Sequence, residues 1–137
     1  MKIRNIALMG LSAMFLTACG TGTVIKDDGT TDAPKWHKDS EAIDERNILD
    51  LRAGTFPAPQ NLAQVRAGMT KDQVSALLGR PQYNDGWRPR EWNYLFNFAT
   101  EKGVVACRYK VLFDKEGLAR SFYWDPVDPK AGSCPAK

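Results

Sequence analysis

The segment WNYLFNF, residues 92–98, carries an aromatic residue at every second position. Successive side chains of a β-strand point to opposite faces of a sheet, so this period of two places the rings on one face. These rings belong to Trp92, Tyr94, Phe96 and Phe98. An apolar face needs a cover, and we expect this one to form the core of a domain. If a covering element packs elsewhere, the face becomes a groove for a peptide or a lipid.

The same alternation continues toward the C-terminus. Residues 105–113 again place apolar side chains at every second position, which predicts a second strand. Residues 114–117, DKEG, form a turn signal because glycine adopts the positive φ that tight turns need. Residues 118–124 then predict a third strand. Three consecutive strands with short connections predict an antiparallel meander.

Two helix start signals precede these strands. Residues 61–64, NLAQ, and 70–73, TKDQ, each place glutamine three positions after a capping residue. The second signal is followed by apolar residues at i, i+3 and i+4, namely Val74, Leu77 and Leu78. Gly79 and Pro81 end this helix, because glycine permits a left-handed turn and proline lacks an amide proton. The apolar stripes of the two helices are the available cover for the aromatic strand face.

The predicted fold class is therefore α+β, with two short N-terminal helices packed on a three-stranded antiparallel sheet (ααβββ). We assign this domain to residues 60–125 and a tail to residues 126–137. The chain has 137 residues, which suits one small core.

The first 18 residues predict a signal peptide. Two basic residues precede an apolar run at 6–16, and eleven helical residues cover only about half of a ~30 Å hydrocarbon core. The following residues 16–19, LTAC, resemble the bacterial lipobox. That resemblance implies cleavage before Cys19 and acylation of its thiol. Gly20, rather than aspartate, after the cysteine implies export to the outer membrane.

Residues 19–59 are predicted to be a lipidated cysteine and a tether. The stretch 20–58 holds eight acidic and five basic residues and little apolar surface, which favours a flexible segment. Forty flexible residues have an r.m.s. reach of about 35 Å. Alternatively, Ser40 could cap a short helix that includes Ile43, Ile48, Leu49 and Leu51, or these apolar residues could dock on the domain.

Four stretches of the chain occur in an order that is typical of one family. They are VRAGMTKDQV at 65–74, LLGRP at 77–81, WNY at 92–94 and YKVLFD at 109–114. Together they resemble the SmpA/OmlA domain of BamE-like outer-membrane lipoproteins, over roughly residues 60–125. The resemblance implies an ααβββ fold and a non-enzymatic accessory role in outer-membrane β-barrel assembly. It also implies two partners, the lipoprotein BamD and phosphatidylglycerol.

Lipidation of Cys19 leaves an even pair, Cys107 and Cys134. In an oxidising compartment such a pair predicts a disulfide, which would tie the tail to the second strand. A loop of about 28 residues gives this bridge roughly 3 to 4 kcal/mol on the chain-entropy estimate. A free redox-active pair and a metal site are the alternatives, although no C-x-x-C motif supports them.

Composition gives few reasons to expect other chemistry. Without residues 1–18 the chain keeps 17 basic and 16 acidic residues, so we expect no nucleic-acid partner. The single histidine, His37, lies in the predicted tether, where nothing would hold a catalytic base. We expect no enzyme activity, cofactor or metal. Six acids are expected to be solvated surface charges: Asp72, Asp85, Glu91, Glu101, Asp114 and Asp125.

The segment DGWRPREW, residues 85–92, is the best candidate for binding. Trp87, Arg88 and Arg90 could meet an anionic headgroup or a partner surface. Alternatively, Trp87 covers the core edge and the arginines are solvated.

Three functions fit these observations. The first is an outer-membrane lipoprotein, periplasm-facing, that supports membrane assembly by binding a protein partner. The second is an anionic-lipid or peptidoglycan-associated envelope lipoprotein independent of the barrel-assembly machine. The third is an inhibitor-like binding module.

Overall fold

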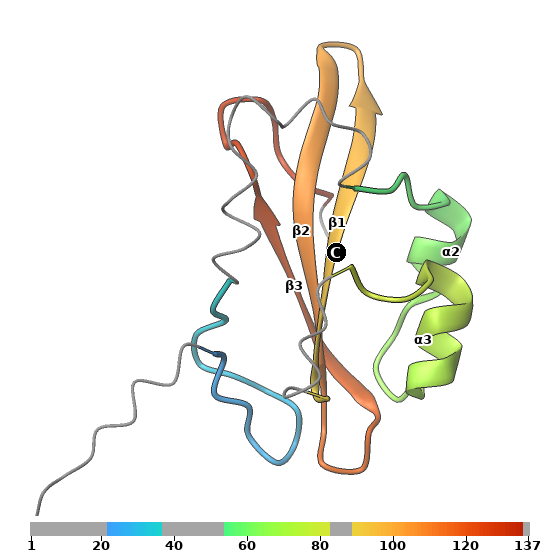
Figure 1. The fold of residues 1–137 in the computed structure, drawn as a ribbon, viewed down its shortest axis with the longest axis vertical. Helices are drawn as coiled ribbons and strands as arrows, with labels where there is room; N and C mark the ends of the chain where they lie inside the picture. Colours follow the sequence, from blue (N-terminus) through green and yellow to red (C-terminus); the bar gives the residue numbers. More distant parts are fainter. Residues whose placement is uncertain (1–21, 37–53, 83–88, 136–137) are drawn as a thin grey trace, which may run out of the picture.

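The computed structural model describes residues 22–36, 54–82 and 89–135. Two short helices precede three strands along the chain, which confirms the predicted ααβββ order. The elements are α2 (Pro59–Gln64), α3 (Lys71–Leu78), β1 (Glu91–Thr100), β2 (Gly103–Phe113) and β3 (Ala119–Pro126). Figure 1 shows the two helices on one side of the sheet and the segment 22–36, in blue, on the other.

The sheet is an antiparallel meander in the order β1-β2-β3. Its register aligns Tyr94 of β1 with Tyr109 of β2, and Tyr109 with Trp124 of β3. A row of aromatic rings therefore crosses the sheet on the helical side, with the Tyr109 and Trp124 centroids 4.3 Å apart. A register shift at the start of β3 leaves Arg120 without an opposite residue, which is a β-bulge.

The second helix begins as the sequence predicted, whereas the first begins three residues earlier. The Thr70 side chain accepts a hydrogen bond from the Gln73 amide, and the Gln73 side chain accepts one from the Thr70 amide. This capping box starts α3. In α2 the N-cap is Ala58 rather than Asn61, because Pro59 has the fixed φ and the missing N–H that suit the first helical position.

The core lies between α3 and the aromatic side of the sheet. Its buried members are Val74 of α3 with Tyr94, Phe96, Tyr109, Val111, Phe113 and Ala119 of the strands. The Tyr94 hydroxyl donates a hydrogen bond to the Gly79 carbonyl, 2.9 Å away, and so fixes the end of α3. At the start of α3, Ala119 exchanges backbone hydrogen bonds with Gly68 and Met69. The prediction that the strand aromatics form the core is confirmed for Tyr94 and Phe96, whereas Trp92 and Phe98 are half-buried.

The opposite side of the sheet differs from the sequence-based expectation. The segment 22–36, hereafter the strap, was predicted to belong to a flexible tether, but it lies against all three strands (Figure 1). Two acids expected at the surface, Glu91 and Asp114, are 5% and 2% exposed. Buried polar groups need hydrogen-bond partners, and the strap supplies a part of them. Residues 37–53 of the predicted tether lie outside the described residues.

The tail continues from β3 back onto the aromatic side. Cys107 of β2 and Cys134 form a disulfide with their Cα atoms 5.9 Å apart. Gly132 approaches so closely that an added Cβ would lie 2.8 Å from a methyl carbon of Val105. The tail therefore covers the end of the sheet that the helices leave open.

Candidate functional site

An apolar groove opens between α2 and the aromatic side of the sheet. It encloses about 630 Å³ and is lined by Pro59, Leu62, Ala63, Val65, Phe98, Tyr109, Phe122, Trp124 and Pro135. The groove exists because α2 has no buried residue of its own and touches the sheet only through half-buried side chains. We name this feature the aromatic groove. The groove lies where the sequence alternative places a peptide or lipid groove, and its occupant stays a prediction.

The wall of the aromatic groove includes a phenol, that of Tyr109. Within the described residues no side chain or backbone group hydrogen-bonds to the Tyr109 hydroxyl. Burial, and secondarily the neighbouring Tyr94, raise the pKa of the Tyr109 phenol above its ordinary value, which further favours the protonated hydroxyl. A concave apolar site with a phenolic donor suits an apolar group that carries a hydrogen-bond acceptor.

The disulfide builds one wall of the aromatic groove. Pro135 follows Cys134 directly, and Cys134 is bonded to β2. The position of Pro135 in the groove wall therefore depends on the bridge. This gives the Cys107–Cys134 pair a role in shaping a surface as well as in stability.

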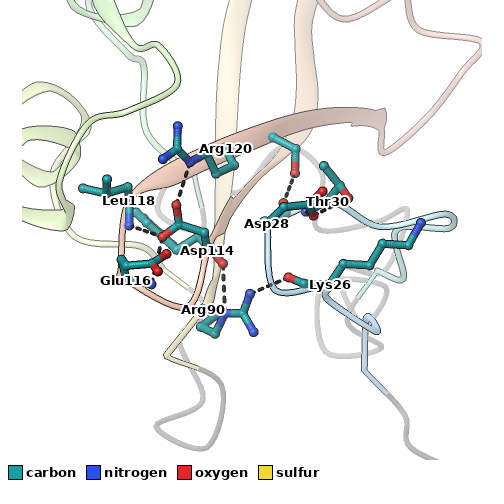
Figure 2. A network of polar contacts seen from close by, with 11 residues as sticks. Lys26, Asp28, Thr30, Arg90, Asp114, Glu116, Leu118 and Arg120 are labelled. Atoms are coloured by element: carbon teal, nitrogen blue, oxygen red, sulfur yellow. Dashed lines mark hydrogen bonds and ion pairs between the residues drawn. The ribbon is translucent and has the colours of Figure 1, made fainter.

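The binding loop predicted at 85–92 is only partly described. Trp87 and Arg88 lie outside the described residues, as does Cys19. Arg90 is half-buried, and its Nε donates to the Phe113 carbonyl at 3.0 Å. Its terminal nitrogen donates to the Lys26 carbonyl at 2.6 Å, so Arg90 fastens the strap to the edge of the sheet (Figure 2). The Arg90 guanidinium thus bonds to two backbone carbonyls of the chain, which differs from the alternative of a solvated arginine.

The turn between β2 and β3 is organised by Asp114 (Figure 2). Its carboxylate accepts hydrogen bonds from the backbone amides of Glu116 and Leu118, and from the Arg120 guanidinium at 2.6 Å. The Leu118 amide and then the Arg120 side chain lower the pKa of Asp114 below its ordinary value. Because every oxygen has a partner, this acid is a structural turn residue.

A second polar network lies beneath the strap. The Lys110 ammonium pairs with the Glu91 carboxylate and donates to Asn93 Oδ1 at 2.8 Å. The Thr23 hydroxyl of the strap donates to Glu91 Oε1 at 3.0 Å, and the Trp36 ring covers the Lys110 ammonium at 4.9 Å. Lys110 is fully buried. These groups face one another across the sheet and the strap, which indicates a structural network rather than an open site.

The described residues contain no arrangement typical of a metal centre or a membrane span. In these three ranges no group of three or more His, Cys, Asp or Glu side chains is placed to hold a metal ion. None of the helices there has the length and apolarity needed to cross a bilayer.

Sequence reasoning did not single out the helix side of the aromatic groove. Leu62 and Val65 are three residues apart, which places them on one face of a helical turn. This spacing was the signal in the sequence that indicated an apolar helix face. It could not show that a groove separates α2 from the sheet, because the groove depends on tertiary packing.

The sequence of the domain has relatives among known proteins. A family model described as the outer membrane protein assembly factor BamE domain matches residues 54–123. The outer membrane protein assembly factor BamE of Neisseria meningitidis is 38% identical over 75 residues, or 53% of this chain and 59% of that protein. The Haemophilus influenzae protein of that name is 30% identical over 83 residues, 60% of this chain and 61% of the relative. The Psychrobacter arcticus protein of that name is 33% identical over 81 residues, which cover 51% of this chain and 58% of that protein. The chain thus spans about three fifths of these curated relatives.

Proposed function

Because the chain belongs to the BamE family, whose domain model covers more than half of it, we propose that it is an accessory in outer-membrane protein assembly. It acts by binding a protein partner and performs no bond-making chemistry. The observation that carries this proposal is the family match over residues 54–123, which include both helices, β1, β2 and most of β3. The relatives that it matches are themselves named outer membrane protein assembly factors.

The lipobox at residues 16–19 supports a lipid anchor on Cys19. The mature chain then resides in the outer membrane and faces the periplasm. Multiple acyl chains make such residence stable, because each buried methylene contributes about 0.8 kcal/mol. The signal peptide is residues 1–18, and the acyl group includes palmitate or a similar chain.

Two surfaces serve partner binding in this proposal. The aromatic groove takes apolar side chains of the partner, since its walls are aromatic and aliphatic and its donor, Tyr109, can bind a backbone carbonyl. The loop residues Trp87 and Arg88 take an anionic group of the partner. Arg90 is left out of this surface because its guanidinium is bonded within the chain. The expected partner, by the family resemblance, is BamD.

Affinity capture from detergent-solubilised outer membranes tests this proposal. The tagged wild-type chain should recover barrel-assembly components, BamD first. Ala63 is exposed and lines the aromatic groove, so Ala63→Asp places a charge in the groove wall and should reduce recovery. The double variant Trp87→Ala, Arg88→Ala should also reduce recovery.

Lys102→Ala is the matched control, since this exposed turn residue lies outside the proposed surfaces. Recovery of no assembly component by the wild-type chain refutes the proposal. Binding to phosphatidylglycerol vesicles or peptidoglycan without such recovery favours the envelope role that is independent of the barrel-assembly machine.

A further inference from the structure

The strap changes how far the domain can stand from a membrane. A flexible tether over residues 19–59 would give the domain an r.m.s. reach of about 35 Å. In the structure the chain is already fastened at Thr23, which is 7% exposed and bonded to Glu91. Four residue steps separate Cys19 from Thr23, and consecutive Cα atoms are 3.8 Å apart, so the connection spans at most about 15 Å.

The fastening of the strap is distributed along its length. Besides Thr23, the Lys26 carbonyl accepts from Arg90, and the Gly29 carbonyl accepts from the Ser121 hydroxyl at 2.6 Å. The Asp27 carbonyl accepts from the Lys115 amide at 3.1 Å. These contacts reach the strand β1 edge, the β2–β3 turn and β3, and Figure 2 shows part of them. A segment held at several separated points is not released by the loss of one contact.

Gly29 is the point of closest approach. Its φ is +81°, and a Cβ built there would lie 2.6 Å from Arg120 Cβ and 2.9 Å from the Asp114 amide nitrogen. Glycine is required both for the backbone conformation and for the space. The strap is therefore shaped to fit this side of the sheet.

We infer that the strap orients the anchored domain, so that the strapped side of the sheet faces the lipid surface and the helices and aromatic groove face away. This inference rests on the proposed acylation of Cys19. A 15 Å connection that leaves from the strapped side keeps that side next to the headgroups. The helices lie across the sheet from the strap (Figure 1), so the partner surfaces stay open to the periplasm.

The surface of the strap is compatible with a position next to lipid, although the strap carries no net positive charge that would attract it to anionic headgroups. Its charged residues are Lys26 and Lys35 against Asp27, Asp28 and Asp32, so their sum is not positive. Val24 is 76% exposed, and it follows the fastened Thr23 directly. An exposed apolar side chain so close to the anchor is placed to touch the headgroup layer. The orientation should therefore be insensitive to salt.

Site-specific photo-cross-linking of the full acylated chain tests this inference. A benzophenone amino acid replaces Val24 on the strap or Ala63 on α2, and the chain is reconstituted in vesicles of phosphatidylethanolamine and phosphatidylglycerol. We expect severalfold more phospholipid adducts at Val24 than at Ala63, at low and at high salt. Equal adduct yields at the two sites overturn the inference.

Two variants separate orientation by the strap from mere proximity to the anchor. A Gly/Ser insertion of about 20 residues between Cys19 and Gly22, with a reach of about 25 Å, leaves the strap contacts unchanged and should abolish the preference for Val24. Gly29→Val should release the strap and weaken the preference, while Asp32→Asn, a change at an exposed strap position, should not. If the insertion leaves the preference intact, the inference is wrong.

Hydrogen exchange distinguishes failure of the inference from failure of the proposed function. In the mature chain carrying Cys19→Ser, the Lys115 amide should be protected, because it donates a hydrogen bond to the Asp27 carbonyl of the strap. The amides of Lys26, Gly29 and Lys35, which donate within the strap, should be protected with it. Unprotected amides refute strap docking and leave the proposed assembly role standing. If instead the Lys115 amide is protected and mass spectrometry finds Cys19 unacylated in the wild-type chain isolated from membranes, the anchor is refuted.

Discussion

Replacing Lys110 by methionine tests the polar network beneath the strap. Methionine keeps most of the side-chain length and removes the ammonium that pairs with Glu91 and donates to Asn93. Lys110 is 0% exposed and Glu91 is 5% exposed, so water cannot replace the lost partner without local opening. Removing one member of a buried pair costs about 3–5 kcal/mol of the free energy of unfolding. A small domain has only about 5–15 kcal/mol in total.

The assay is urea unfolding of the mature chain carrying Cys19→Ser, followed by tryptophan fluorescence. With an m-value of about 1–3 kcal/mol per molar urea, a loss of this size lowers the midpoint by roughly 2 M. Lys102→Met is the matched control, because Lys102 is exposed in the β1–β2 turn and should change stability by less than about 0.5 kcal/mol.

A double variant separates the buried charge from the packing. Adding Glu91→Leu to Lys110→Met removes both charges, and this should restore much of the stability lost by the single change. The account of the network is refuted if Lys110→Met stays within about 1 kcal/mol of the wild type. It is also refuted if the double variant is no more stable than Lys110→Met.

Three further outcomes follow from the described contacts. Cys134→Ser should lower the free energy of unfolding by about 3–4 kcal/mol, because the bridge closes a loop with a sequence separation of 27, and a reductant should weaken only the wild type. Thr70→Ala should cost about 1 kcal/mol through loss of the capping box, seen as a lower melting temperature, and an unchanged melting temperature would contradict the cap assignment. In the folded state the pKa of Asp114 is lowered from 3.8. The contribution of its carboxylate to the free energy of unfolding is therefore complete above pH 3.8 and is lost as pH falls through the lowered pKa. The stability difference between the wild type and Asp114→Asn should therefore shrink in acid, and a difference that stays constant from neutral to strongly acidic pH would count against this role.

The local signals of the sequence predicted the fold well. The capping box at Thr70, the aromatic alternation from Trp92 and the glycine turn before β3 each act within a few residues. Such signals do not depend on distant parts of the chain. The start of α2 was misplaced because two start signals, Asn61 and Pro59, lie two residues apart and compete.

The polar side of the sheet could not be predicted in the same way. Glu91 and Lys110 occupy positions where alternation predicts solvent, and only a distant segment turns that side into an interior. The composition of the strap resembles that of a linker. Its docking depends on backbone carbonyls of the strap that accept hydrogen bonds from the sheet side, and on the Thr23 hydroxyl, which donates to Glu91. The aromatic groove escaped prediction for the same reason, since the gap under α2 is a property of packing.

Quantification of outer-membrane β-barrel proteins in a strain that lacks this chain tests the assembly role most directly. The account predicts lower barrel-protein levels, restored by the wild-type chain and by Lys102→Ala but not by Ala63→Asp. Immunoblots of the variants confirm equal amounts of the accessory. Unchanged barrel-protein levels in the deletion strain, under conditions where the wild-type chain is present in the parent membrane, would contradict it.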